Sequence, residues 1–114
     1  CAPGKSILAN LPKQELEEYL NHVTLKKFTP RTLNTIAALE KELEKVKESG
    51  FAEDLAEGLE GIHCVSAVIL DDYQYPVGAI TTIAPTFRLP EERFKEIGTH
   101  CLEAAREIKN KILE

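Results

Sequence analysis

The protein has 114 residues, a length that favours one domain with a single hydrophobic core. Apolar residues make up 43% of the chain and charged residues 29%, a mixture that excludes an intrinsically disordered segment. Acidic residues outnumber basic ones by 19 to 14, a net charge of −5 with no basic face evident, so we do not expect this chain to contact DNA directly.

Membrane and redox signals narrow the class of protein further. No apolar run reaches the roughly 18 residues that a bilayer span requires, and no signal peptide is recognisable, so we expect no membrane contact. The three cysteines, Cys1, Cys64 and Cys101, are widely spaced and form no CxxC pair. This pattern favours reduced thiols and a cytoplasmic location over a disulfide framework. Because the chain opens CAPGKS without an initiating methionine, we expect it to be cut from a longer protein.

The first half of the chain predicts three helices. A short helix covers 4–11, and a second helix covers 12–20, with proline as its first residue. A loop over 24–33 leads to a third helix at 35–49, which Gly50 ends as a left-handed cap. The apolar stripe of this third helix consists of Ile36, Leu39, Leu43 and Val46.

The middle of the chain predicts three strands. A short strand covers 51–54 and a loop covers 56–61. Two longer strands at 62–70 and 76–83 are joined by a turn over 71–75. Both longer strands carry β-branched residues and are apolar on both faces, so we expect helices to cover the sheet on both sides.

A connection over 84–89 leads to a last helix, which is expected to begin near Pro90 and run towards Leu113. Its apolar stripe consists of Phe94, Ile97, Cys101, Ala104, Ile108 and Ile112. We therefore interpret Cys101 as a small core residue. Three helices followed by three strands and a helix predict an α+β fold rather than a series of βαβ units.

Three patterns that suggest chemistry have stronger structural explanations. Gly4-Lys5-Ser6 resembles the end of a phosphate-binding loop but lacks the earlier glycine and the preceding strand. The His63–Cys64 and His100–Cys101 pairs point their side chains apart, the first on a strand and the second on a helix, so we predict no metal site. No histidine stands in an obvious catalytic context for a cysteine nucleophile, so we predict no enzymatic activity and no cofactor.

The two longer strands place small polar side chains among apolar ones. A two-residue turn between Asp71 and Gln74, or a four-residue turn about the same centre, pairs Cys64 with Thr81. A slip of one residue brings Thr82 onto the Cys64 face instead. Either register places a thiol and a hydroxyl on one surface. They are satisfied core residues, which periodicity alone favours, or the polar groups of a ligand site.

Several segments in succession resemble the effector-binding domain of IclR-type transcriptional regulators. They are CAPGKSILANLP, FTPRTL, GFAED, the spacing Glu57-x-x-x-Gly61-x-x-Cys64, YPVGAITTIAP and FRLPEER. The resemblance implies a GAF-like α+β fold, in which an antiparallel sheet is packed with helices. It also implies that residues 1–114 are the C-terminal portion of the domain, without its first part, and that the DNA-binding winged helix-turn-helix lies outside this chain.

The same resemblance implies a function. The domain would sense a small effector of the carboxylate class, and its occupancy would change the operator affinity of the attached helix-turn-helix. Contact with DNA would be made only by that other domain, and the regulator would be a homodimer or homotetramer. Two alternatives stay open, a GAF-like sensor outside transcription and a GAF-like redox enzyme that uses Cys64.

Four of the ligand positions of that family match the start of the chain and the first two strands. Ala2 and Pro3 should approach the ligand through their backbone, although Pro3 has no N–H to donate. Asp54 matches an acidic pocket residue, and Cys64 matches the pocket cysteine.

The remaining two ligand positions match the last strand. Thr81 replaces a frequent serine and keeps its hydroxyl donor, whereas Ile83 replaces a second serine and makes the site more apolar. Glu57 matches a common loop glutamate, for which we expect a structural role. The resulting hypothesis is a small organic acid bound over Cys64 and Thr81.

Overall fold

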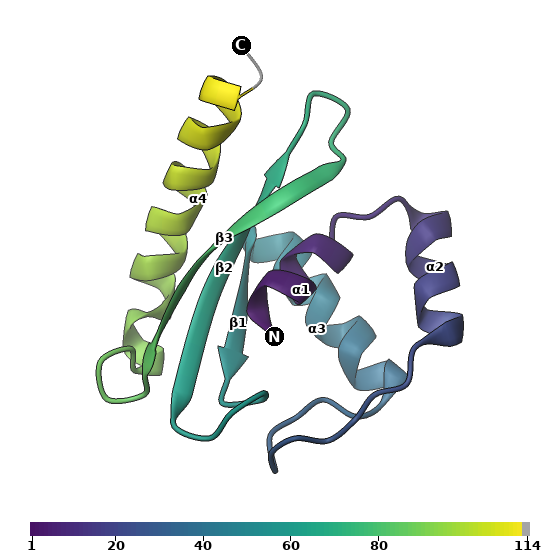
Figure 1. Ribbon diagram of the computed structural model, residues 1–114, viewed down its shortest axis with the longest axis vertical. Helices are drawn as coiled ribbons and strands as arrows, with labels where there is room; N and C mark the ends of the chain where they lie inside the picture. The colour runs from purple at the N-terminus through teal and green to yellow at the C-terminus, as the bar shows by residue number, and fades with distance from the viewer. Residues whose placement is uncertain (113–114) are drawn as a thin grey trace.

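The computed structural model describes residues 1–112, which form the predicted α+β fold (Figure 1). These residues contain four α-helices, one 3₁₀ helix and a three-stranded antiparallel sheet with the strand order β1-β2-β3. In chain order the elements are α1 (Ala2–Leu8), α2 (Lys13–His22), α3 (Ile36–Ser49), β1 (Phe51–Leu55), β2 (Ile62–Leu70), β3 (Pro76–Pro85), η1 (Glu91–Arg93) and α4 (Phe94–Ile112). Helices α1 and α3 lie on one side of the sheet and α4 lies on the other.

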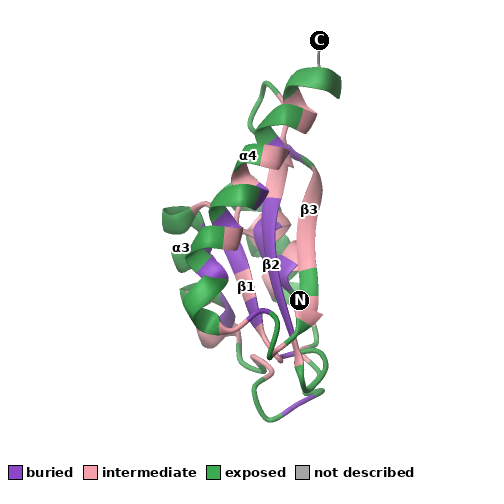
Figure 2. Ribbon diagram, turned by 90° about the vertical axis from the view of Figure 1, so that its left-hand side faces the viewer, coloured by how far each residue is buried: buried purple, intermediate pink, exposed green. Residues whose placement is uncertain are grey.

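The sheet is covered on both sides, as its apolar strands predict. We call its two surfaces the α1 face and the α4 face. The α1 face includes Ala52, Asp54, Ile62, Cys64, Ser66, Thr81 and Ile83. The α4 face includes Phe51, Val65, Ala67 and Thr82. Figure 2 shows that the buried part of the sheet follows β2, whereas β3 is intermediate to exposed after its buried first residue.

Helix α3 shows how local sequence sets both ends of an element. The Thr35 hydroxyl oxygen accepts the Ala38 N–H at 3.1 Å and so caps the start of the helix. Gly50 ends the helix with a φ of 87°, a left-handed conformation that glycine adopts without steric cost. The buried side of the helix consists of Leu39, Leu43 and Val46, three members of the predicted stripe.

The first two helices differ from the expected boundaries. α1 begins at Ala2 rather than at residue 4, so that Pro3 lies in its first turn, where a missing N–H costs no helical hydrogen bond. Pro12 is the N-cap of α2 rather than its first helical residue. α2 buries none of its residues, and its Glu15 carboxylate accepts a hydrogen bond from the Tyr75 hydroxyl at 2.9 Å.

The turn between β2 and β3 covers 71–75, as predicted, but it is not the two- or four-residue turn from which the pairing of the strands was predicted. Asp71 and Tyr75 close it, because the Asp71 N–H donates to the Tyr75 carbonyl at 2.9 Å. The Asp71 carboxylate also accepts the N–H groups of Tyr73 and Tyr75, which holds the turn together. An irregularity between Ile69 and Leu70 then shifts the pairing of the strands beyond it.

The predicted pairing of Cys64 with Thr81 is therefore wrong. Cys64 lies opposite Ile83, and Thr81 lies opposite Ser66. The shift equals two residues, and since side chains alternate with a period of two, Cys64 and Thr81 still share the α1 face. Thr82 points to the other face, where its hydroxyl lies 3.5 Å from the Cys101 thiol.

The last helix confirms the predicted stripe only in part: Phe94 and Cys101 are buried, whereas Ile112 is 68% exposed. The 3₁₀ helix η1 precedes it, so that the α-helix itself begins at Phe94, and the predicted end at Leu113 lies outside the described residues. Cys101 is only 4% exposed, as expected for a core residue, while Ala105 rather than Ala104 completes the buried side. Among residues 1–112, no helix combines the length and the apolar character that crossing a membrane requires.

Candidate functional site

Four of the six predicted ligand residues form one group on and above the α1 face. Asp54 and Cys64 pair across β1 and β2 and are 5% and 6% exposed. Ala2, at the start of α1, is fully buried in the same apolar cluster as Cys64. Ile83 lies on the far side of Cys64, on β3, and is 66% exposed. The structure thus brings Ala2, Asp54 and Cys64 together and leaves Ile83 at the open side.

The environment of Cys64 keeps its thiol neutral. Burial is the largest cause of its raised pKa, and the Asp54 carboxylate raises the pKa further. A thiol with a raised pKa is a weak nucleophile at neutral pH. This chemistry counts against a redox enzyme that uses Cys64. No cluster of three or more His, Cys, Asp or Glu side chains suited to a metal ion is found within residues 1–112.

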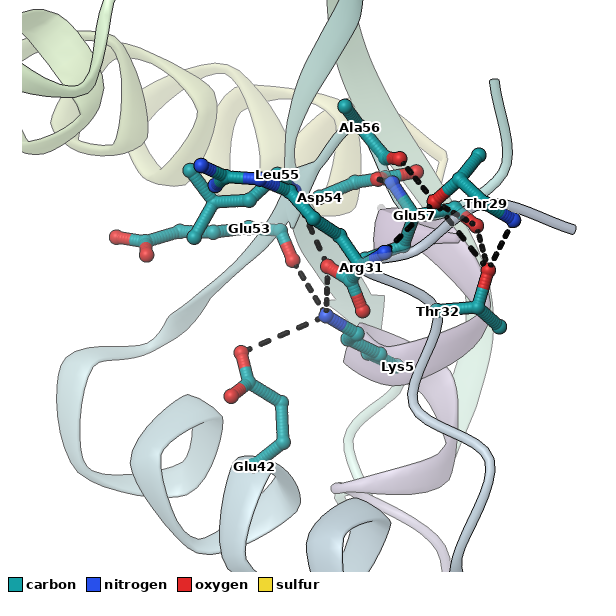
Figure 3. A network of polar contacts seen from close by, with 10 residues as sticks. All are labelled: Lys5, Thr29, Arg31, Thr32, Glu42, Glu53, Asp54, Leu55, Ala56 and Glu57. Carbon is teal, nitrogen blue, oxygen red and sulfur yellow. Dashed lines mark hydrogen bonds and ion pairs between the residues drawn. The ribbon is translucent and has the colours of Figure 1, made fainter. Parts of the chain in front are cut away.

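Asp54 is hydrogen-bonded to one member of a buried ion pair, which joins Lys5 of α1 to Glu57 (Figure 3). Its Oδ1 accepts the Glu57 N–H at 2.7 Å. The Glu57 carboxylate in turn accepts a hydrogen bond from the Lys5 ammonium at 2.7 Å and from the Leu55 N–H at 3.1 Å. Lys5 also donates to the Glu53 carbonyl at 2.7 Å. Glu57 therefore has a structural position between α1 and the connection after β1.

Two threonines fasten the segment 24–33, which contains no helix or strand, to the same connection. The Thr29 hydroxyl donates to the Ala56 carbonyl at 2.6 Å, and the Thr32 hydroxyl donates to the Glu57 carbonyl. Thr32 also accepts the Thr29 N–H at 2.9 Å. The polar network in Figure 3 therefore joins α1, the segment 24–33 and the end of β1 into one unit beside Asp54.

Thr81 belongs to a line of hydroxyl groups that crosses from β3 to α1. Its Oγ1 lies 3.0 Å from the Ser66 Oγ, which lies 3.5 Å from the Ser6 Oγ. Ser6 donates to the Pro3 carbonyl at 2.9 Å, so Pro3 takes part through its carbonyl rather than through an N–H. Thr81 and Pro3 are both half-buried, whereas Ser6 and Ser66 are fully buried.

Ser6 and Ser66 were not selected as site residues from the sequence. The available signal was spacing, because Ser66 lies two residues after Cys64 on one strand and Ser6 lies four residues after Ala2 on one helix. These spacings place each serine on the same face as a predicted ligand residue. What the sequence does not show is that α1 lies across β2, so that the two serines meet.

The principal cavities among residues 1–112 lie away from Cys64, Thr81 and Ile83. One, of about 540 Å³, is enclosed by α1, α2, the segment 24–33 and the loop after β1, with Lys5 and Glu57 in its wall. A second, of about 520 Å³, lies between α2 and α3, beside the connection that precedes α2. Of the predicted ligand side chains, only Thr81 and Ile83 lie on the open flank of the sheet, where β3 is the edge strand, whereas Ala2, Asp54 and Cys64 are buried.

Comparison with known proteins identifies the class to which this fold and site belong. The family described as "Bacterial transcriptional regulator IclR C-terminal" matches residues 1–110. The chain therefore belongs to the IclR family of bacterial transcriptional regulators, and it corresponds to their C-terminal, effector-binding region. The resemblance inferred from the sequence motifs is confirmed.

Individual relatives agree with this assignment. The chain is 36% identical over 105 residues to the HTH-type transcriptional repressor AllR of Escherichia coli strain K12. The matched region covers 92% of this chain and 39% of AllR. The crystal structure of IclR from Thermotoga maritima superposes with a TM-score of 0.92 at 41% identity, over 96% of this chain and 44% of that one. The C-terminal domain of E. coli KdgR gives a TM-score of 0.86 at 33% identity, over 96% and 66%. The chain spans less than half the length of AllR and of the T. maritima protein.

Proposed function

We propose that this chain is the effector-sensing part of an IclR-type transcriptional regulator, and that residues 1–114 form the C-terminal portion of its effector-binding domain. One observation carries the proposal. Asp54, Cys64 and Thr81 are three separate polar groups on the α1 face, where they lie among apolar side chains beside the start of α1. A few polar groups on an apolar wall are the usual composition of a small-molecule site.

The effector is a small organic acid. Its carboxylate lies near the backbone of Ala2 and Pro3, and its other end extends over Cys64 and Thr81. Ile83 supplies an exposed apolar contact where the related family position often carries a hydroxyl. Because Pro3 donates no N–H, the carboxylate has one backbone donor fewer than in family members without this proline.

The function is conformational coupling rather than catalysis. An effector that prefers one arrangement of the regulator changes operator affinity by the difference between its affinities for the two arrangements. DNA is contacted by a winged helix-turn-helix domain outside this chain, which agrees with the net charge of −5 of these 114 residues. The regulator acts in the cytoplasm, without a membrane partner, as a homodimer or homotetramer.

The proposal is tested by titration calorimetry of the full-length protein that contains this chain, against a panel of two- to seven-carbon carboxylates. Thr81→Val should weaken the binding of an acid from this panel by at least about fivefold, which corresponds to the loss of one neutral hydrogen bond. Cys64→Leu should weaken it more, because a larger side chain packed against Ala2 would displace the start of α1, where the carboxylate is proposed to bind. Thr82→Val is the matched control, since its hydroxyl lies on the α4 face.

Unchanged affinity in both Thr81→Val and Cys64→Leu would remove the site assignment. If no carboxylate of the panel binds, the proposal that the effector is an organic acid is wrong. A sensor outside transcription would bind an effector without any change in DNA affinity of the whole protein, and an electrophoretic mobility shift with and without the acid separates these two functions. The relatives, which are transcriptional regulators, favour the first.

A further inference from the structure

The hydroxyl groups of Ser6, Ser66 and Thr81 can be assigned their protons by counting. Each hydroxyl has a single proton to donate. The Ser66 Oγ lies 3.1 Å from the Ile80 carbonyl, and a carbonyl oxygen can only accept. The Ser6 Oγ stands in the same relation to the Pro3 carbonyl, at 2.9 Å. Both serine protons are therefore committed to backbone oxygens.

This count decides the direction of the hydrogen bond between Ser66 and Thr81. Their oxygens lie 3.0 Å apart, a separation typical of a made hydrogen bond. Since the Ser66 hydroxyl donates its hydrogen bond to the Ile80 carbonyl, the hydrogen bond between the two hydroxyls is donated by Thr81. The longer separation of 3.5 Å between Ser6 and Ser66 agrees with a contact that holds no proton.

Thr81 consequently presents only lone pairs to whatever binds beside it. The sequence interpretation made Thr81 a donor, as its serine counterpart would be, but in the structure its donor is directed inward to a fully buried serine. Ser66 is fixed in place because it is enclosed between α1 and the sheet and is held by the Ile80 carbonyl. A ligand oxygen that carries no hydrogen cannot form a hydrogen bond with Thr81, because both oxygens are acceptors. A ligand hydroxyl can donate its hydrogen bond to the Thr81 oxygen.

We infer that Ser66 is a specificity-determining residue, which fixes Thr81 as an acceptor and so makes the site select acids that carry a hydroxyl or N–H donor beside the carboxylate. The expected effectors are 2-hydroxy acids rather than the corresponding 2-oxo acids. This inference rests on the proposed function, because it takes the ligand to be an organic acid bound over Thr81.

The size of the preference follows from the cost of reversing the hydroxyl pair. To donate to a 2-oxo group, Thr81 must release Ser66, and Ser66 must leave the Ile80 carbonyl to donate to Thr81 in turn. That rearrangement loses one neutral hydrogen bond, so a 2-hydroxy acid should bind roughly fivefold more tightly than its 2-oxo partner.

The test uses the full-length protein and three matched pairs of acids: lactate and pyruvate, 2-hydroxyisovalerate and 2-oxoisovalerate, 2-hydroxyglutarate and 2-oxoglutarate. Both enantiomers of each hydroxy acid are titrated calorimetrically into the wild type, Ser66→Ala, Thr81→Val and Thr81→Ser. The quantity compared is the ratio of dissociation constants within a pair. Intrinsic differences between the hydroxy and oxo acids cancel when the same ratio is taken in wild type and variant.

In the wild type the ratio should favour the hydroxy acid about fivefold. Ser66→Ala frees the Thr81 proton, so the oxo acid gains affinity and the ratio falls towards one. Thr81→Val removes the discrimination by removing the hydroxyl, and Thr81→Ser retains it. Circular dichroism verifies that each variant is folded, and the isosteric Thr81→Val still tests the inference if Ser66→Ala does not fold.

Two results overturn the inference while the proposed function stands: a wild type that binds acids but favours the oxo member of each pair, or a preference for the hydroxy acid that Ser66→Ala and Thr81→Val leave unchanged. Absence of binding for every acid in the panel overturns the proposed function itself, and the inference falls with it. The two failures are therefore distinct.

Discussion

Lys5 carries a positive charge into the interior, where 5% of its side chain is exposed. Its ammonium lies 2.7 Å from the Glu57 carboxylate and 3.5 Å from that of Glu42. Replacing Lys5 with Met would leave the buried Glu57 carboxylate without its counter-ion. We expect Lys5→Met to lower the free energy of unfolding by about 3–5 kcal/mol, measured by urea denaturation, because an uncompensated buried charge is costly.

Two controls separate charge from packing at this position. Lys5→Met combined with Glu57→Gln removes both charges and should recover part of the lost stability. Lys13→Met makes the same lysine-to-methionine substitution on the exposed surface of α2. It should alter the free energy of unfolding by no more than about 0.5 kcal/mol. Equal losses for Lys5→Met and Lys13→Met would contradict a buried ion pair.

Cys64 gives a second prediction at this scale. Its raised pKa means that the folded protein binds the thiol proton more tightly than the unfolded chain does. The stability from this group is thus complete below the ordinary thiol pKa and is lost as pH rises through the higher folded pKa. At pH 7, a thiol reagent should label the exposed Cys1 quickly and Cys64 only slowly, with the labelled sites located by mass spectrometry. Rapid labelling of Cys64 in the folded protein would support the alternative that the protein is a redox enzyme that uses Cys64.

The packing of α4 on β1 depends on a residue without a side chain. A Cβ added at Gly98 would lie 2.6 Å from ring carbons of Phe51, which is too close for any contact. Alanine favours a helix over glycine by about 1 kcal/mol, but forcing the ring aside costs about 1–3 kcal/mol. We expect Gly98→Ala to be destabilising on balance in thermal or urea unfolding.

A double-mutant cycle tests this cause directly. In a Phe51→Ala background the ring is absent, so Gly98→Ala should become neutral or stabilising. If Gly98→Ala costs the same stability with and without the Phe51 ring, the close approach is not its cause.

Elements that local sequence dictates could be predicted. The apolar stripe of α3 and its Gly50 stop are each determined by a few neighbouring residues, and the structure has both. The register of the hairpin could not be predicted in the same way. It depends on how Asp71 folds back on Tyr75 and on the irregularity at Ile69 and Leu70, neither of which periodicity reveals.

The site shows the same division. The alternation of side chains placed Cys64 and Thr81 on one face correctly, even though their direct pairing was wrong. The contact of Ser6 with Ser66 joins residues 60 positions apart, and it exists only because α1 crosses β2. Whether Thr81 donates or accepts depends on its hydrogen bond to Ser66 and on the Ile80 carbonyl beside Ser66. This role could therefore not be predicted before the fold was known.

At the scale of the whole molecule, burial is concentrated in the sheet and is absent from α2. β2 lies between two strands and between α1 and α4, and five of its consecutive residues, 63–67, are buried. α2 has no buried residue and stands apart from the sheet (Figure 1). Cavities lie between it and both α1 and α3. Since tertiary packing supplies most helical stability, α2 should open independently of the sheet.

Hydrogen exchange of the full-length protein, followed by mass spectrometry, measures this difference. Amides of α2 should exchange at least about 100-fold faster than those of β2, because opening an unburied helix costs little while β2 opens only with the domain. α3 is the internal control: it is also a surface helix, but it buries Leu39, Leu43 and Val46 and should stay protected. Protection of α2 equal to that of α3 would mean that α2 is held by contacts beyond those with residues 1–112. An effector bound over Cys64 and Thr81 should slow exchange in β2 and β3 and leave α2 unchanged, since α2 adjoins neither residue.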